Sequence, residues 1–232
     1  MTRIAVVSDI HANIHALNAL LRFLDDWFPV SKILNLGDFI QIGPNPLEVF
    51  DIVMKDGRFV NIMGNSEAMF FDQTMLRQYE HEKAHQEWTV RQLGEERMNR
   101  LKAVPLQRTA EISGVRFFMT HARPGAAAGQ PLLYQQRPFE EFIMDYPGDS
   151  EYVLIGHTHL PLHAVYWNGR PIVNPGSVGC GKDGRVRFVT MELEDDAVSV
   201  SYRQLKYDKE RVLLDYRERS VPCADRFISL FY

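Results

Sequence analysis

Five short polar clusters, each directly behind an apolar β-like segment, constrain the fold of this chain more than any other feature. The segments are Arg3–Ser8, Ser31–Leu36, Arg58–Met63, Val115–Thr120 and Glu151–Ile155. The clusters that follow them are Asp9-Ile10-His11, Gly37-Asp38, Gly64-Asn65, His121 and Gly156-His157-Thr158-His159. Side chains at the ends of neighbouring strands meet at one edge of a sheet. We therefore expect the five clusters to form one site in an α/β fold.

The first part of the chain alternates strand and helix signals. Asn13 is expected to cap a helix whose apolar face begins at Ile14, and Pro44 and Pro46 precede a second helix near Leu47–Lys55. Such βαβ units predict parallel neighbouring strands with right-handed crossovers. The stretch from 67 to 102 lacks a strand signal and predicts a helical insert of two helices beside the site.

The second half is rich in strands and turn dipeptides. Ser113-Gly114, Asn168-Gly169, Asp183-Gly184 and Asp195-Asp196 separate β-rich runs and indicate hairpins. In addition to the segments given above, strands are expected at Gln107–Ile112, His163–Trp167, Arg185–Glu192 and Val198–Gln204, and a helix around Pro138–Asp145. Parallel and antiparallel strands should therefore be mixed, and the apolar-aromatic tail should pack back on the body.

Composition narrows the class of protein. With 232 residues and 45% hydrophobic content, residues 1–232 are expected to form a single domain with a large core. A net charge of −4 gives no basic surface for specific nucleic-acid binding. The N-terminus lacks a signal-peptide pattern, and no apolar run reaches the ~20 residues of a membrane span. Cys180 and Cys223 are expected to be reduced thiols of a cytoplasmic protein without a catalytic role.

The clusters indicate a metal site only when they are considered together. Read alone, Asp38 behind Gly37 is as compatible with a turn residue as with a ligand, and Gly64-Asn65 alone would be a turn. The pair His157 and His159 is more informative, because two imidazoles so close at a strand end rarely serve packing. Imidazoles, carboxylates and an amide oxygen that all fall at strand ends indicate a metal site with enough ligands for two ions.

The ordered series Asp-x-His, Gly-Asp, Gly-Asn, His and Gly-His-x-His resembles the calcineurin-like metallophosphoesterase superfamily. The similarity runs from Arg3 to about Gly179, where the turn 174–179 is similar to that of the small bacterial phosphodiesterase branch. The resemblance implies a four-layer αββα sandwich, with two mixed β-sheets flanked by helices. It also implies a dinuclear site in which Asp9, His11 and His159 bind one ion. The bridging residue would be Asp38, and the second ion would be held by Asn65, His121 and His157.

General metal chemistry agrees with this implied assignment. A carboxylate can bridge two cations through its two oxygens, and mixed oxygen and imidazole ligands suit Mn²⁺ first, with Fe, Zn²⁺, Ni²⁺ or Co²⁺ as alternatives. Two such ions can clamp the attacking and leaving oxygens of an in-line displacement, with a bridging hydroxide attacking phosphorus. The catalytic residues would then be Asp38, Asn65 and His121.

Position 66 departs from the superfamily pattern. The third motif of the superfamily usually continues with a histidine that is thought to protonate the leaving oxygen, whereas this chain has Ser66 followed by Glu67. A hydroxyl is a poor acid near neutral pH, which favours the branch without this histidine. His81, His85 and Glu87 in the insert are possible substitutes, although we expect them to be solvated helix residues.

Three further side chains are candidates for substrate binding. They are Asn13, Ser66 and Arg123. For Asn13, contact with substrate is weighed against its role as a helix cap. Arg123 is as compatible with a structural ion pair as with a phosphate contact. His15 and His163 are not expected to be ligands.

The sequence therefore predicts a cytoplasmic, metal-dependent phosphoesterase. The first expectation is a phosphodiesterase acting on a small phosphate ester or nucleotide-like substrate, with neither nucleic acid nor membrane as a partner and a homo-oligomer left open. The alternatives are a phosphomonoesterase, a dinucleoside polyphosphate hydrolase, and a non-catalytic scaffold of the kind found in retromer-type trafficking subunits. The filled ligand positions disfavour the scaffold.

Overall fold

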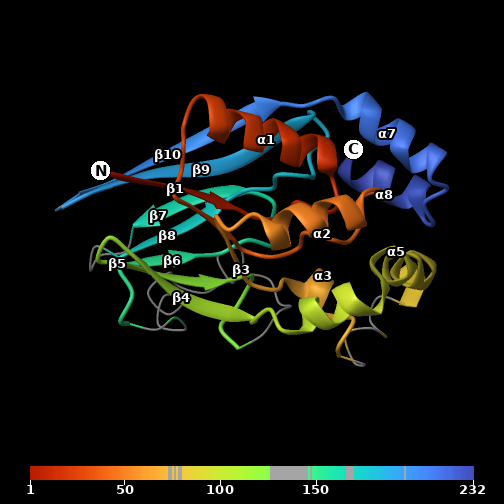
Figure 1. Cartoon of the computed structure of the whole chain (residues 1–232), viewed down its shortest axis with the longest axis horizontal. Helices are drawn as coiled ribbons and strands as arrows, with labels where there is room; N and C mark the ends of the chain where they lie inside the picture. Colours follow the sequence, from red (N-terminus) through yellow and green to blue (C-terminus); the bar gives the residue numbers. More distant parts are fainter. Residues whose placement is uncertain are drawn as a thin grey trace.

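Two five-stranded mixed β-sheets form the centre of the computed structural model (Figure 1). The structure describes residues 1–72, 75, 77, 80–125, 146, 148–165, 170–195 and 197–232. The fold class predicted from the sequence, a mixed α/β sandwich of two sheets with helices, is confirmed.

The first sheet has the strand order β10-β9-β1-β2-β3. Its strands are β1 (Thr2–Val7), β2 (Lys32–Asn35), β3 (Phe59–Asn61), β9 (Arg185–Glu194) and β10 (Ala197–Lys206). The strands β1, β2 and β3 are parallel, and β9 pairs antiparallel with both β1 and β10. Their shared direction brings the residues after β1, β2 and β3 to the same edge.

The second sheet has the strand order β4-β5-β6-β8-β7. Its strands are β4 (Gln107–Ile112), β5 (Val115–Thr120), β6 (Tyr152–Leu154), β7 (Pro161–Val165) and β8 (Pro171–Pro175). Here β5, β6 and β8 are parallel, whereas β4 and β7 run antiparallel at the two edges. The residues after β5 and β6 therefore also share one edge.

Alternating side chains divide the first sheet between two cores. Val6 and Leu34 point to the second sheet, where they pack with Phe117 and Leu154 in a fully buried cluster. Their neighbours along the strands belong to a separate core with the helices. Full burial of such a side chain contributes about 1.5–3 kcal/mol, so both faces help to fix the strand register.

The helices α1 (Ile14–Asp26) and α2 (Pro46–Lys55) cover the outer face of the first sheet (Figure 1). The Asn13 side chain accepts a hydrogen bond from the Ala16 backbone N–H at 3.0 Å, so the predicted cap is confirmed. Pro46 occupies the first turn of α2, where the missing N–H of proline is tolerated. On the predicted apolar face of α1, Leu17, Leu20 and Leu24 are buried, whereas Ile14 and Leu21 are half-buried.

The remaining described helices gather beside the carboxyl ends of the strands. They are α3 (Asn65–Ala68), the 3-10 helix η1 (Glu80–Glu82), α5 (Lys83–Lys102), α7 (Lys209–Glu218) and α8 (Ala224–Phe231). The long helix α5 is interrupted at Gly94, which has a φ of 72°. The tail packs back as predicted, since Val212, Tyr216 and Phe227 are buried. None of the described helices combines the length and apolarity required to cross a bilayer.

The strand β8 was not predicted from the sequence, because prolines at 171 and 175 flank its apolar residues. Proline cannot donate to a ladder, but it is tolerated at the ends of a strand, and these two occupy the first and last positions of β8. The neighbouring strand β7 begins at Pro161, two residues before the expected start. The expected helix around 138–145 and the hairpin dipeptide at 168–169 lie outside the described residues.

Candidate metal centre

All seven side chains expected to bind metal lie together at the shared edge of the two sheets. Asp9 and His11 follow β1, Asp38 follows β2 and Asn65 follows β3 in the first sheet. In the second sheet His121 follows β5, and His157 and His159 follow β6. A hydrogen bond joins the loops across the two sheets, because the His157 backbone N–H donates to the Asp9 side-chain oxygen Oδ2 at 3.1 Å.

The ligand loops concentrate unusual backbone geometry. Asp9, His11, Asp38, His157 and His159 have φ angles of 56°, 46°, 55°, 67° and 58°. The left-handed region costs a side chain other than glycine roughly 1–2 kcal/mol per residue, and such strain collects at functional sites. The fold therefore holds five of the seven expected ligands in a backbone conformation that is energetically unfavourable for residues other than glycine.

The glycines of the motifs allow this close approach. A Cβ atom at Gly64 would lie 2.0 Å from Asp38 Oδ1, and one at Gly156 would lie 2.0 Å from Ser8 Oγ. Both distances are far below contact between real atoms. Glycine is therefore needed at both positions because a larger residue would prevent the loops from packing this closely.

One group of side chains gathers around Asp9. The Oδ1 atom of Asp9 is 3.3 Å from His159 Nε2 and 3.6 Å from His11 Nε2, and the two Nε2 atoms are 3.0 Å apart. Within the described part of the chain this oxygen has no hydrogen-bond partner, although Asp9 is fully buried. An orphaned carboxylate oxygen facing ring nitrogens fits a divalent cation, because all these atoms offer lone pairs.

A second group gathers around His121. His121 Nε2 lies 3.1 Å from Asn65 Oδ1, and His157 Nδ1 lies 2.8 Å from the same oxygen. His121 Nδ1 is 2.7 Å from the backbone carbonyl of Leu36, so this nitrogen donates and Nε2 keeps its lone pair for a ligand position. The donor set again fits a divalent cation.

Asp38 belongs to both groups. Its Oδ2 lies 3.8 Å from His11 Nε2 and 3.4 Å from His121 Nε2, while its Oδ1 accepts the Ser66 backbone N–H at 2.8 Å. The sequence-based argument had the carboxylate bridge through two oxygens. In the structure one oxygen faces ring nitrogens of both groups and the other accepts a backbone N–H, so bridging through two oxygens stays a prediction.

The buried charges depend on one another. Burial raises the pKa of the Asp9 and Asp38 carboxyls, but the adjacent imidazoles outweigh it and hold both values well below the usual range. Burial lowers the pKa of His121, yet the Asp38 carboxylate outweighs this effect and raises the pKa to about 10. The buried carboxylates therefore require positive charge from imidazolium protons or from cations.

Glu67 is a structural member of the site whose role the sequence did not reveal. Its carboxylate accepts backbone N–H groups of Asp38, Phe39, Ile40 and Gly64 at 2.7–3.1 Å. Burial and the Asp38 charge raise its pKa to about 7, while these donors lower it. In the sequence, the only indication of this role was that an acidic residue follows Ser66. In the structure it ties the loops after β2 and β3 together.

A cavity of about 280 Å³ opens onto the candidate metal centre. Its remaining walls come from α3, the insert, the loop after β2 and the tail. Besides the metal-site residues it is lined by Gln41, Ile42, Ser66, Met69, Glu82, Thr158 and Phe231. The helical insert thus lies beside the site, as predicted.

The expected substrate-binding residues have different surroundings. Ser66 lines the cavity. Asn13 is fully buried, and its amide is engaged by the Ala16 N–H and the Gly179 carbonyl. Arg123 does not line the metal cavity, although its backbone carbonyl accepts the Thr120 hydroxyl at 3.2 Å.

The expectation of solvated insert histidines is wrong for His85. Its ring is buried between Trp88 and Phe227, with centroids at 5.4 and 4.8 Å, because the tail folds over the insert. His81 is exposed and lies 3.0 Å from an Arg226 nitrogen. Both described cysteines are free, as expected.

Comparison with known proteins agrees with this architecture. An uncharacterized protein of Methanocaldococcus jannaschii is 26% identical over 220 residues, which cover 88% of each chain. The crystal structure of a metallophosphoesterase from Sphaerobacter thermophilus has a TM-score of 0.74 at 24% identity over 98% of both chains. A hypothetical protein of Pyrococcus horikoshii OT3 has a TM-score of 0.84 at 22% identity, covering 100% of this chain and 98% of its own.

The sequence profile of the calcineurin-like phosphoesterase superfamily domain matches residues 2–196. This range contains every strand-end cluster and both ligand groups around Asp38. The chain belongs to the calcineurin-like phosphoesterase superfamily.

Proposed function

We propose that this chain is a dinuclear metal-dependent phosphodiesterase that hydrolyses small phosphate esters. The supporting observation is the position of Asp38 Oδ2 between the His11 and His121 ring nitrogens. In that arrangement Asp9, His11 and His159 would hold one ion and Asn65, His121 and His157 the other. Residues 1–232 would then act as one domain, because Phe231 lines the same cavity as these strand-end residues.

The donors favour ions of intermediate hardness. Carboxylate and amide oxygens mixed with imidazoles suit Mn²⁺, with Fe, Zn²⁺, Ni²⁺ and Co²⁺ as the alternatives. When bound, two such ions would supply Lewis-acid activation of water and neutralise charge on phosphoryl oxygens. The chain itself fixes the donors, since Glu67 and the Ser66 N–H hold the Asp38 loop before any ion arrives.

The charge of the cavity favours a diester over a monoester. Among the described residues, no lysine or arginine lines the metal cavity, and the Glu82 carboxylate that does is paired with Arg226, whose Nε lies 3.5 Å from Glu82 Oε1. A monoester dianion would bring one more negative charge into this cavity than a diester monoanion. No cationic side chain among these lining residues would hold that second charge, which disfavours the monoester.

The test is a divalent-metal titration of metal-free protein combined with a panel of phosphate esters. We expect Mn²⁺ to restore hydrolysis, and bis(4-nitrophenyl) phosphate to be cleaved with a higher kcat/KM than 4-nitrophenyl phosphate. A higher kcat/KM on the monoester would instead establish a phosphomonoesterase. Metal binding without hydrolysis of any ester would favour the scaffold function and contradict the proposal.

A further inference from the structure

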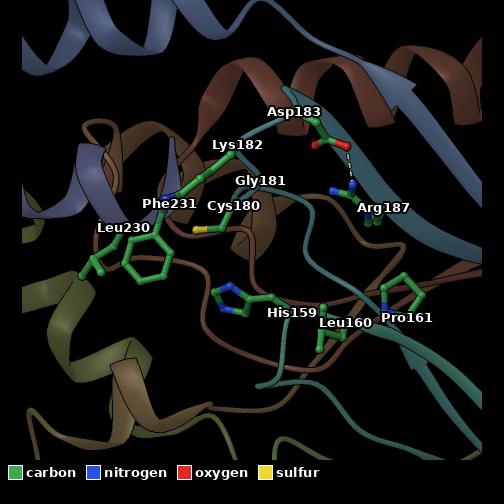
Figure 2. Close-up of a pocket in the computed structure, with 10 residues that line it drawn as sticks. All are labelled: His159, Leu160, Pro161, Cys180, Gly181, Lys182, Asp183, Arg187, Leu230 and Phe231. Carbon is green, nitrogen blue, oxygen red and sulfur yellow. Dashed lines mark hydrogen bonds and ion pairs between the residues drawn. The ribbon is translucent and has the colours of Figure 1, made fainter.

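A second cavity of about 390 Å³ adjoins the metal cavity and shares two of its residues (Figure 2). His159 and Phe231 line both cavities. Because His159 belongs to the candidate metal centre, a substrate held at that centre lies next to this second space. The second cavity is therefore placed to contact one part of a bound substrate.

Phe231 forms the wall between the two cavities. Its ring centroid lies 5.7 Å from that of His159 and 6.2 Å from that of His11. Its backbone carbonyl accepts the Gly181 N–H at 3.0 Å, which ties the end of α8 to the floor of the second cavity. This anchoring allows an aromatic face to separate the two groups esterified to one phosphorus.

The second cavity carries the opposite charge from the metal cavity. Arg187 is paired with Asp183, whereas the Lys182 ammonium has no hydrogen-bond or ion-pair partner among the described residues (Figure 2). Two cations against one carboxylate leave one positive charge in excess. The Lys209 ammonium adds a further positive charge nearby, since it donates to the Lys182 carbonyl at 2.9 Å. The exposed Leu160 and Leu230 side chains provide apolar surface beside this charge.

Resting on the phosphodiesterase function above, we propose that this second cavity is a subsite for one arm of the diester, and that Lys182 selects an arm carrying a second phosphate group. The apolar walls suit a sugar or base between the two phosphates. The metal cavity takes the other arm on the opposite side of Phe231. The substrate class is therefore a phosphodiester with an additional terminal phosphate, such as a short 5′-phosphorylated nucleotide.

The experiment compares two thymidine dinucleotides, one with and one without a 5′-phosphate, as inhibitors of bis(4-nitrophenyl) phosphate hydrolysis by the Mn²⁺-loaded protein. The measured quantity is the ratio of the two inhibition constants within each protein, so any change in turnover cancels. We expect the 5′-phosphorylated dinucleotide to bind the wild type on the order of fivefold more tightly, as for a partly exposed ion pair. The ratio should fall to about one in Lys182→Ala and persist in Lys182→Arg.

The matched control is Lys206→Ala, because Lys206 is an exposed lysine outside this cavity. It removes the same charge and should keep the wild-type ratio. A wild-type ratio near one, or a ratio that Lys182→Ala leaves unchanged, overturns the subsite. If the wild type does not hydrolyse the chromogenic diester, the phosphodiesterase proposal fails instead. The ratio of dinucleotide affinities is then measured by calorimetry, with the same expected and contradicting results.

Discussion

At the scale of single residues, Asp38 has the most constrained position in the candidate metal centre. One of its oxygens faces ring nitrogens of both ligand groups, and the other accepts a backbone N–H. A carboxamide of the same size would remove the negative charge that two cations are expected to share. Asp9 Oδ1 also lies 3.9 Å from His121 Nε2, but it is closer to His159 Nε2, at 3.3 Å. Loss of Asp9 or of any remaining ligand should therefore affect mainly one ion position.

We therefore predict that Asp38→Asn lowers kcat/KM for a nitrophenyl phosphodiester by at least about 100-fold, more than substitution of any other single ligand. The measurement is steady-state hydrolysis with metal content determined on the same samples. Asp51→Asn makes the same chemical change at a surface ion pair with Arg97 and serves as the control. Near-normal activity and metal content in Asp38→Asn would rule out the bridging role.

Ser66 leads to a prediction about the leaving group. A positioned general acid is typically worth about 10²–10⁴-fold, and Ser66 lines the cavity where the superfamily usually has an imidazole. The wild-type rate should therefore fall steeply as the leaving alcohol becomes less acidic. Ser66→His should flatten this dependence if the new ring reaches the leaving oxygen.

The measurement is the rate over a graded series of aryl and alkyl phosphodiesters for both proteins. Metal content must be equal, because Ser66 adjoins Asn65 and its backbone N–H holds Asp38. A shallow dependence in the wild type would show that another group supplies the proton, and the prediction would be wrong.

At the scale of elements, strands and their ends were predictable, but contacts between distant elements were not. The β-rich runs on either side of Ser113-Gly114 predicted the observed bounds of β4 and β5, and strand-end polar residues identified the loops that converge. The strand β8 was missed because its prolines occupy the ends of the strand. The burial of His85 was missed because it depends on α8, which is more than 130 residues away in the sequence. No local pattern records such packing.

This packing of α5 against α8 predicts a pH dependence of stability. Burial lowers the pKa of His85 from 6.5 to about 4, and neither ring nitrogen has a hydrogen-bond partner among the residues that the structure describes. The unfolded chain therefore binds this proton at a higher pH than the folded chain does. The resulting loss of stability develops as the pH falls from 6.5 to about 4.

His85→Phe keeps a ring of similar size and removes this proton. Between pH 8 and pH 5 the free energy of unfolding of the wild type should therefore fall by roughly 2 kcal/mol more than that of the variant. Urea unfolding of metal-free protein at both pH values measures the difference. Titration of the other histidines is common to both proteins and cancels. The same change in stability with pH in both proteins would contradict the account.

At the scale of the whole molecule, the candidate metal centre joins the two sheets. Asp9, His11, Asp38 and Asn65 come from the first sheet, and His121, His157 and His159 come from the second. Ions held by both sets would stabilise the folded state by mass action, since the unfolded chain lacks the site. Which residues meet at this edge was predictable from the position of each polar cluster directly behind a strand-like segment. The use of one Asp38 oxygen, the four-donor cradle of Glu67 and the cavity beyond Phe231 required the structure.

Whether two ions share Asp38 can be measured by the electron paramagnetic resonance spectrum of Mn²⁺-loaded protein. Metal-free protein is titrated with Mn²⁺, and bound metal and the low-temperature spectrum are recorded together. We predict two bound ions per chain and the multiline spectrum of an exchange-coupled pair, since ions sharing a carboxylate lie about 3.5–4 Å apart. A single bound ion per chain, or two ions with the spectrum of isolated Mn²⁺, would contradict the account.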